Sequence, residues 1–175
     1  MTALQELTHL LNSNILNKFD TIIIGGFSEP FYKASIDGHS AEIQFTRDYF
    51  RSALHELSHW CVAGAKRRKM DDYGYWYSQD GRNQQQQNEF FKVEIKPQAI
   101  EWAFSVLCEI EFEVSVDNLN QDVDGVKAFE FSVKNQLNDL LCGGFNIRTT
   151  EVIQLISKLK KINNAISYID HKINS

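Results

Sequence analysis

The stretch DYFRSALHELSHWCVAGA, residues 48–65, has apolar residues at three- and four-residue spacing. This spacing predicts an amphipathic helix that packs one side on the core, and Asp48 is positioned to cap its N-terminus. Residues four apart share a helical face, so we expect the rings of His55 and His59 to lie side by side. The stretch is therefore predicted to be a helix that presents two neighbouring imidazoles.

Further elements are predicted on both sides of this helix. Before it, the patterns favour a helix opened by a capping box between Thr2 and Gln5, followed by three short strands; the ranges are 2–17, 21–24, 31–34 and 41–45. After it, we expect a strand-like aromatic segment over 72–77, helices over 83–91 and 97–109, a strand over 114–116, and helices over 126–140, ending at Gly143-Gly144, and over 152–162. These elements predict one α+β domain over residues 1–175, rich in helices, with a small sheet in its first half.

Composition excludes several classes of protein. Apolar residues make up 43% and charged residues 23% of the 175 residues, which is typical of a globular domain. The net charge of −5 argues against general binding to phosphate backbones, so a nucleic-acid partner is not expected. The sequence has no apolar run long enough to cross a bilayer and no secretion signal. Three widely spaced cysteines do not suggest a disulfide framework, and we expect a cytoplasmic protein.

The pentapeptide from His55 to His59 is an H-E-x-x-H motif on a predicted helix, which indicates metal binding. A catalytic metal site usually has three protein ligands and an open position, so a third ligand is expected from elsewhere in the chain. Carboxylates downstream of the motif are the candidates, and spacing alone does not choose among them: Asp71, Asp72, Glu94 and Glu101.

Two chemistries are compatible with this motif. With zinc, Glu56 would be the general base that activates water, as in a metallopeptidase. With Fe(II), two histidines and one carboxylate form a facial triad with free positions for O₂ and substrate. Glu56 points about 100° away from His55 on a helix, which disfavours it as a third ligand. We expect it to orient water or substrate instead.

Three blocks extend the pattern well beyond the motif. They read HELSHWCVAGAKRRK over 55–69, DYGYWYSQDGR over 72–82 and VEIKPQAIEW over 93–102. In this order and spacing the chain resembles the bacterial elongation factor P hydroxylase family, with a further echo at 29–32. The resemblance implies O₂-dependent hydroxylation of a lysine of elongation factor P that already carries a β-lysyl group. It also implies a fold like that of a metal-dependent ribosomal-RNA endonuclease family.

The resemblance also implies a ligand set. His55 and His59 match the family's two histidines, and Glu94 matches the acid of its VExKPQ block, with Glu101 as the reserve candidate. Fe(II) is the expected metal, with Zn(II) or another divalent metal as the alternative. The alternative function is a zinc-dependent hydrolase, either a peptidase or a nuclease. The sequence has no nucleotide-binding motif and no 2-oxoglutarate-binding pattern that would identify an electron donor.

The residues after the motif are candidates for substrate binding. Aromatic faces at Tyr73, Tyr75 and Trp76 would flank the long cationic arm through cation–π contacts, and Asp72 would pair with one of its amines. The alternative for these rings is a strand that packs into the core.

Two further features follow the motif in sequence. The four cations at 66–69 would dock an acidic surface of the protein substrate or form a solvated helix end; nucleic-acid contact is a third option, which the acidic chain disfavours. Gln98 is a candidate hydrogen-bond partner of a ligating imidazole.

Overall fold

Three short strands form the sheet: β1 (Thr21–Phe27), β2 (Phe31–Lys33) and β3 (Ala41–Thr46). In the computed structural model, which describes residues 1–74, 84–116 and 123–175, β3 is the central strand. It pairs in parallel with β1 and antiparallel with β2. Ile43 faces Ile23 on one side and Tyr32 on the other, and alternate residues of β3 are buried. The period-two pattern therefore predicted the central strand correctly.

Helix α1 (Ala3–Asn14) covers the outer edge of this sheet. The predicted capping box is present, because Thr2 and Gln5 exchange hydrogen bonds of 2.8 and 3.2 Å between side chains and backbone. The Asn12 side chain accepts from the Ile23 N–H at 2.8 Å and donates to the Ile23 carbonyl at 3.0 Å. It satisfies both backbone groups of an edge residue that has no further strand beside it.

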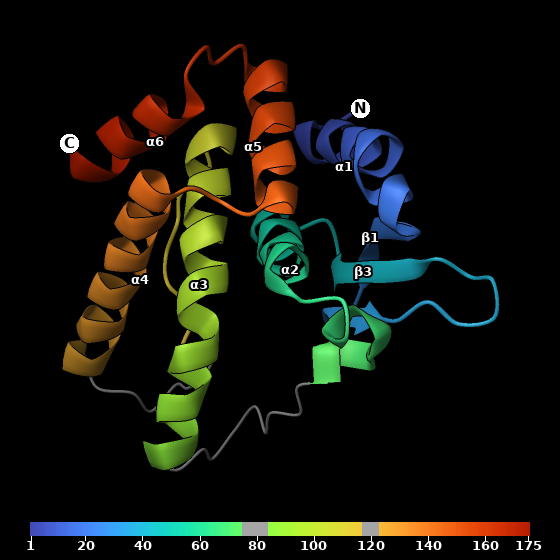
Figure 1. Ribbon diagram of the computed structural model, residues 1–175, viewed down its shortest axis with the longest axis horizontal. Coiled ribbons are helices and arrows are strands. Elements are labelled where there is room, and N and C mark those ends of the chain that lie inside the picture. Colours follow the sequence, from blue (N-terminus) through green and yellow to red (C-terminus); the bar gives the residue numbers. More distant parts are fainter. Residues whose placement is uncertain (75–83, 117–122) are drawn as a thin grey trace.

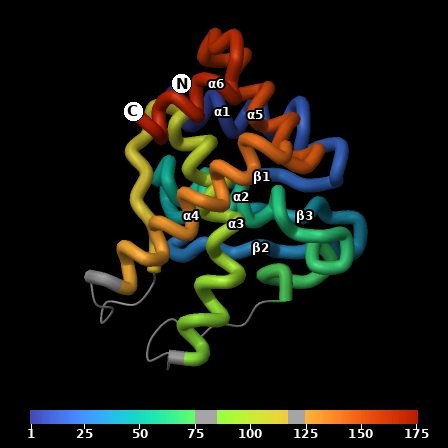
Figure 2. The backbone as a smooth tube through the Cα atoms, turned by 60° about the vertical axis from the view of Figure 1, so that its left-hand side comes forward, coloured from blue at the N-terminus to red at the C-terminus, as the bar shows by residue number. Residues whose placement is uncertain are grey.

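Helix α2 (Phe50–Val62) is the predicted helix of the metal motif, and it packs between β3 and α3 (Figures 1 and 2). Its apolar side, with Leu57 and Trp60 fully buried, faces the core. The predicted cap was wrong: the N-cap is Tyr49, which makes no side-chain capping bond. Asp48 lies one residue too early, in a turn where Arg47 adopts a left-handed conformation (φ 47°).

Helix α3 (Gln84–Cys108) corrects the prediction of two helices separated near Pro97. Pro97 lies inside this single helix, although a proline in a helix interior costs roughly 3 kcal/mol. The residues that follow are buried, among them Ile100 and Phe104, and their packing outweighs that cost. Several buried residues of α3 are polar, so its buried face is not a continuous run of apolar side chains. The apolar periodicity in the sequence therefore did not predict the full length of the helix.

Two predicted strands are not found among the described residues. Residues 114–116 are extended but belong to no strand there; the Gln98 side chain instead pairs with both backbone groups of Ser115, at 2.8 and 2.9 Å. Residues 72–74 form part of a short 3₁₀ turn (Asp71–Gly74) in place of the start of an aromatic strand. The remainder of that predicted segment, residues 75–77, lies outside the described residues.

Helices α4 (Val123–Gly143), α5 (Ile147–Lys160) and α6 (Ala165–Asn174) form the second half of the chain (Figure 1). The predicted stop is present: α4 ends at Gly143, and Gly144 (φ 93°) donates its N–H to the Leu140 carbonyl. Helix α6 was not predicted. Buried side chains from both halves belong to one hydrophobic cluster, which makes the protein a single helix-rich α+β domain. The described helices include none with the length and apolar character needed to span a bilayer.

Candidate metal centre

His55 and His59 lie one turn apart on α2, and their rings meet as the four-residue spacing predicts. The two Nε2 atoms are 3.1 Å apart. Both side chains are partly accessible, with 25% of His55 and 15% of His59 exposed. The imidazole pair is therefore at the edge of the core, where a small ligand can reach it.

Glu94 completes this group from α3, the neighbouring helix. Its Oε1 lies 3.2 Å from His59 Nε2, and its Oε2 lies 3.8 Å from His55 Nε2. One donor atom from each of the three residues lies within 4.8 Å of the others, a spacing that suits a shared metal ion. The three residues implied as ligands by the family resemblance are thus brought together.

Glu101, the reserve candidate, has a different position. Its Oε2 lies 2.8 Å from Nδ1 of His55, which is the ring nitrogen on the far side from Glu94. The carboxylate is almost fully buried. A carboxylate behind a histidine fixes the orientation of the ring and makes the opposite nitrogen a better ligand. Glu101 is therefore placed to support His55 from behind.

The two aspartates after α2 bind backbone groups of β2 and of the residue that follows it. Asp72 accepts the Tyr32 N–H at 2.9 Å, and Asp71 accepts the Ala34 N–H at 2.8 Å. They are not members of the ligand group found among the described residues. Their sequence proximity to the motif misled because their oxygens are bound to the backbone beside the sheet.

Gln98 contacts the carboxylate and not an imidazole, which corrects the sequence expectation. Its Nε2 donates to Glu94 Oε2 at 3.1 Å and to the Ser115 carbonyl at 2.8 Å. Its Oε1 accepts the Ser115 N–H at 2.9 Å, and the side chain is fully buried. Gln98 therefore links the candidate ligand Glu94 to the extended segment that passes beside α3.

Charges in this cluster shift one another strongly. Burial would raise the pKa of Glu94, but the imidazoles of His59 and His55 lower it to about 2. Burial lowers the pKa of His55, yet Glu101 and Glu94 outweigh it and hold that pKa well above its usual value. The pKa of His59 is raised in the same way, because Glu94 outweighs the effect of burial. Without a metal, the neighbouring carboxylates thus raise the proton affinity of each imidazole, and the imidazoles favour the ionised form of Glu94.

Glu56 lies beside the ligand group without belonging to it. Burial raises its pKa, and the nearby imidazoles of His55 and His59 only partly oppose that effect. Asp72 also raises it slightly by charge repulsion. Glu56 is therefore an acid of raised pKa at the edge of the site.

Tyr73 is held against the imidazoles by an unusual turn. Asp72, Tyr73 and Gly74 all have left-handed backbones, with φ of 45°, 56° and 70°. Such a run is costly for side chains other than glycine and needs compensating contacts. The Tyr73 ring is buried; it stacks on Tyr32 at 4.1 Å between centroids and lies parallel to His59 at 6.4 Å. Of the other predicted substrate-binding rings, Tyr75 and Trp76 lie outside the described residues.

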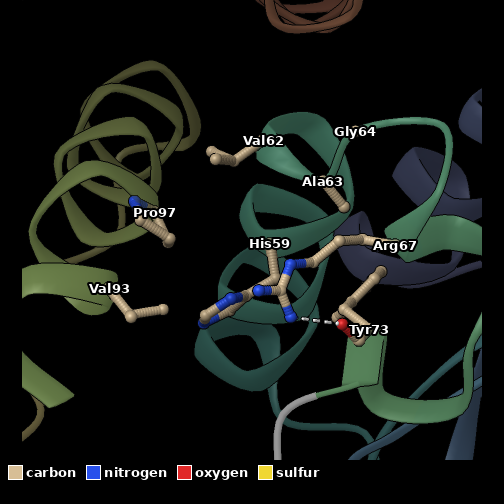
Figure 3. A pocket seen from close by; sticks show the side chains of 8 residues that line it. All are labelled: His59, Val62, Ala63, Gly64, Arg67, Tyr73, Val93 and Pro97. Atoms are coloured by element: carbon tan, nitrogen blue, oxygen red, sulfur yellow. Dashed lines mark hydrogen bonds between the residues drawn. The ribbon is translucent and has the colours of Figure 1, made fainter. Parts of the chain in front are cut away.

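A narrow cavity of about 180 Å³ opens beside His59 (Figure 3). Val93 and Pro97 of α3 form one wall, and the end of α2 with Arg67 and Tyr73 forms the other. The cavity thus has apolar walls for a carbon chain and an imidazole of the candidate ligand group at its side.

Part of the basic run after α2 has a structural role. Arg67 donates to the Tyr73 carbonyl at 2.9 Å, and Arg68 donates to the Ala63 carbonyl at 2.8 Å. Arg148, at the start of α5, also binds the end of α2, because its guanidinium donates to the carbonyls of Cys61 and Ala63. Arg148 was not among the predicted site residues, because no sequence pattern indicates a contact with a segment 85 residues away.

Comparison with known proteins gives a consistent result. Residues 10–168 match the family described as elongation factor P hydroxylase. The elongation factor P lysine hydroxylase of Haemophilus influenzae is 38% identical over 136 residues, which cover 77% of this chain and 76% of that protein.

Proposed function

The chain belongs to the elongation factor P hydroxylase family, and we propose that it hydroxylates the β-lysylated lysine of elongation factor P with O₂ at an iron held by His55, His59 and Glu94. The observation that carries this proposal is the convergence of two imidazoles from α2 and one carboxylate from α3. Two histidines and one carboxylate with open positions are typical of non-haem Fe(II) oxygenases.

The residues present fit such an ion. Ligand bonds of about 2.1 Å place neighbouring donor atoms roughly 3.0–3.4 Å apart, depending on the coordination geometry. Two distances lie in this range: 3.1 Å between the two Nε2 atoms and 3.2 Å from His59 Nε2 to Glu94 Oε1. The distance from His55 Nε2 to Glu94 Oε2 is longer, at 3.8 Å. Imidazole nitrogen and carboxylate oxygen are suitable donors for Fe(II).

The chain's own residues prepare this ligand set. Glu101 holds Nδ1 of His55, so that Nε2 faces the shared position. Gln98 holds one oxygen of Glu94 and leaves the other toward His59. When bound, iron supplies the redox chemistry that O₂ requires. Both supports are buried, so they exclude water from the rear of the site.

The cavity beside His59 is the proposed position of the substrate's arm. Val62, Val93 and Pro97 offer apolar contacts to its methylene groups. Glu56 and Asp72 are the carboxylates proposed to pair with its amines, and Glu56 is the one proposed to hold or transfer a proton. Tyr73 forms part of the wall, and Tyr75 and Trp76 are proposed to flank the arm further out.

Two broader statements belong to the same proposal. We place the enzyme in the cytoplasm, because its substrate is a translation factor. We also propose that the fold resembles that of metal-dependent ribosomal-RNA endonucleases, which superposition on such an enzyme tests directly.

Mass spectrometry tests the proposed reaction. Protein loaded anaerobically with Fe(II) is mixed with β-lysylated elongation factor P, a chemical reductant and O₂. We expect a gain of one oxygen on the modified lysine, and none with Zn(II) or with His59→Ala. Elongation factor P without the β-lysyl group is the matched substrate control. Product formed equally well with zinc, or without O₂, would contradict the proposal.

A further inference from the structure

Exposed cations lie on one side of the cavity beside His59. Lys66, Arg67 and Lys69 are exposed in the segment after α2, and Arg67 lines the cavity itself. Figure 3 shows this residue opposite the wall contributed by α3.

Lys92 and Lys96 on α3 are also exposed, but each points about 100° away from the lining residue that follows it, so they are not counted here. We call the three residues after α2 the cationic rim: Lys66, Arg67 and Lys69. It stands out on a chain whose net charge is −5.

The rim lysines form no ion pair with any residue that the structure describes. Lys18, Lys33, Arg51 and Lys160 each form an ion pair with a glutamate elsewhere on the surface, whereas Lys66 and Lys69 form none within the described part of the chain. Asp71 and Asp72 lie close in sequence, but they accept the backbone N–H groups of Ala34 and Tyr32.

The rim has the wrong sign for the substrate's arm. A β-lysyl-lysine side chain carries amines, and like charges repel one another at close range. The rim must therefore serve a different part of the substrate, with negative charge. Phosphate backbones are disfavoured as that partner by the overall charge of −5. An acidic protein surface satisfies both conditions.

We propose that the cationic rim docks an acidic surface of the protein substrate beside the target lysine. This inference rests on the proposed function, because it assumes that the target lysine enters the cavity. The rim attracts the body of the substrate and brings the arm to the mouth of the cavity. Attraction of this kind acts mainly on the association rate and weakens as salt is added.

Charge reversal tests the rim without touching the cavity. Lys66→Glu/Lys69→Glu changes two exposed lysines and leaves Arg67, which holds the Tyr73 carbonyl. The matched control is Lys158→Glu/Lys172→Glu, with the same change in charge on exposed residues of α5 and α6. Those helix ends lie at the opposite end of the molecule from the 71–74 turn (Figure 1).

Binding is measured first, with metal-free full-length protein and labelled β-lysylated elongation factor P, so that the result does not depend on turnover. At low salt we expect the rim variant to bind about tenfold more weakly or worse, and the control to bind within about twofold of wild type. The difference should shrink in 1 M salt, where the Debye length is about 3 Å.

Turnover then separates docking from chemistry. The rim variant should raise KM for intact elongation factor P and leave kcat unchanged. Both constants should be unchanged for a short peptide that carries the modified lysine.

Equal binding by the rim variant and the control overturns the inference. An equal loss of activity on the intact protein and on the peptide overturns it as well. Tighter binding of wild type to an RNA oligonucleotide than to elongation factor P would assign the rim to nucleic acid and also overturn it. Absence of hydroxylation by wild type, with the binding difference intact, would count against the proposed function alone.

Discussion

Glu101 contacts His55 only from behind. Its Oε2 lies 2.8 Å from His55 Nδ1, and both groups are largely removed from water. A hydrogen bond to an ionised group is stronger than a neutral one, and burial strengthens it further. The orientation of one candidate ligand thus depends on a residue that has no contact with the shared metal position.

We therefore predict that Glu101→Ala weakens metal binding by about 10- to 100-fold, and that Glu101→Gln has a smaller effect because the amide oxygen still accepts from the ring. Anaerobic titration with Fe(II) or Co(II) measures the affinity. Glu89→Gln, an exposed acid on the same helix, is the control and should bind normally. Unchanged affinity in Glu101→Ala would show that His55 is oriented by other contacts.

The sequence predicted the histidine pair but not the arrangement of the acids. His55 and His59 share one helix, so their proximity follows from helical geometry alone. Glu94 and Glu101 reach the site from another helix, and their order depends on how α3 is rotated against α2. Glu94 and Glu101 are seven residues apart, so they share one face of α3. Their spacing therefore does not predict which of the two carboxylates approaches the Nε2 atoms of the imidazoles. The family resemblance singled out Glu94, and the structure shows Glu101 behind His55.

At the scale of elements, α3 and the segment after it depend on side-chain amides. Gln98 satisfies both backbone groups of Ser115, and Gln87 donates to the Val116 carbonyl at 3.4 Å. The β-branched residues at 114 and 116 predicted a strand, whose backbone would be hydrogen-bonded to a second strand. Here glutamine side chains from α3 make these hydrogen bonds instead, and no pattern in the local sequence indicates this.

Replacing Gln98 by leucine removes the amide that joins Ser115 to Glu94. We predict a loss of about 1–3 kcal/mol in the free energy of unfolding, because the Ser115 N–H loses the amide oxygen that accepts it. We also expect weaker metal binding, since one oxygen of Glu94 is released. Hydrogen exchange at Ser115 and metal titration measure the two effects. Slow exchange that persists in Gln98→Leu would contradict this role.

The C-terminal end of α2 is held by α5. Arg148 donates to the carbonyls of Cys61 and Ala63, and Asn146 donates to the Cys61 carbonyl at 3.0 Å. A helix leaves its last carbonyls without partners, and a cation at this end is favourable. The helix carrying the imidazole pair is therefore fixed by a segment that begins more than 80 residues later.

Arg148→Ala should destabilise the protein by about 1–3 kcal/mol, because two buried carbonyls lose a charged donor. Arg148→Lys should recover part of this loss, as it keeps the charge without the planar fork. Denaturant unfolding followed by circular dichroism measures both. Equal stability of the alanine variant and wild type would mean that Asn146 suffices to cap α2.

For the molecule as a whole, the metal cluster makes stability depend on pH. The folded pKa values of His55 and His59 lie above their usual 6.5, so their stabilising effect is fully present below pH 6.5 and is lost as the pH rises through the folded values. The pKa of Glu94 falls from 4.5 to about 2, so its effect is present above pH 4.5 and is lost as the pH falls toward 2. Both effects operate together between about pH 4.5 and 6.5.

We therefore predict that the metal-free protein is most stable near pH 5–6 and loses about 1 kcal/mol or more by pH 8.5. A metal ion replaces the protons on the imidazoles, so the loaded protein should keep its stability at pH 8.5. Urea unfolding at pH 5.5, 7 and 8.5, with chelator and with Zn(II), measures both curves. His55→Gln/His59→Gln is the control and should flatten the metal-free curve above pH 6. The cluster would not govern stability if the metal-free protein gained stability from pH 6 to 8.5.

Because the apolar core does not include these groups, chelation should leave the fold intact at every pH tested.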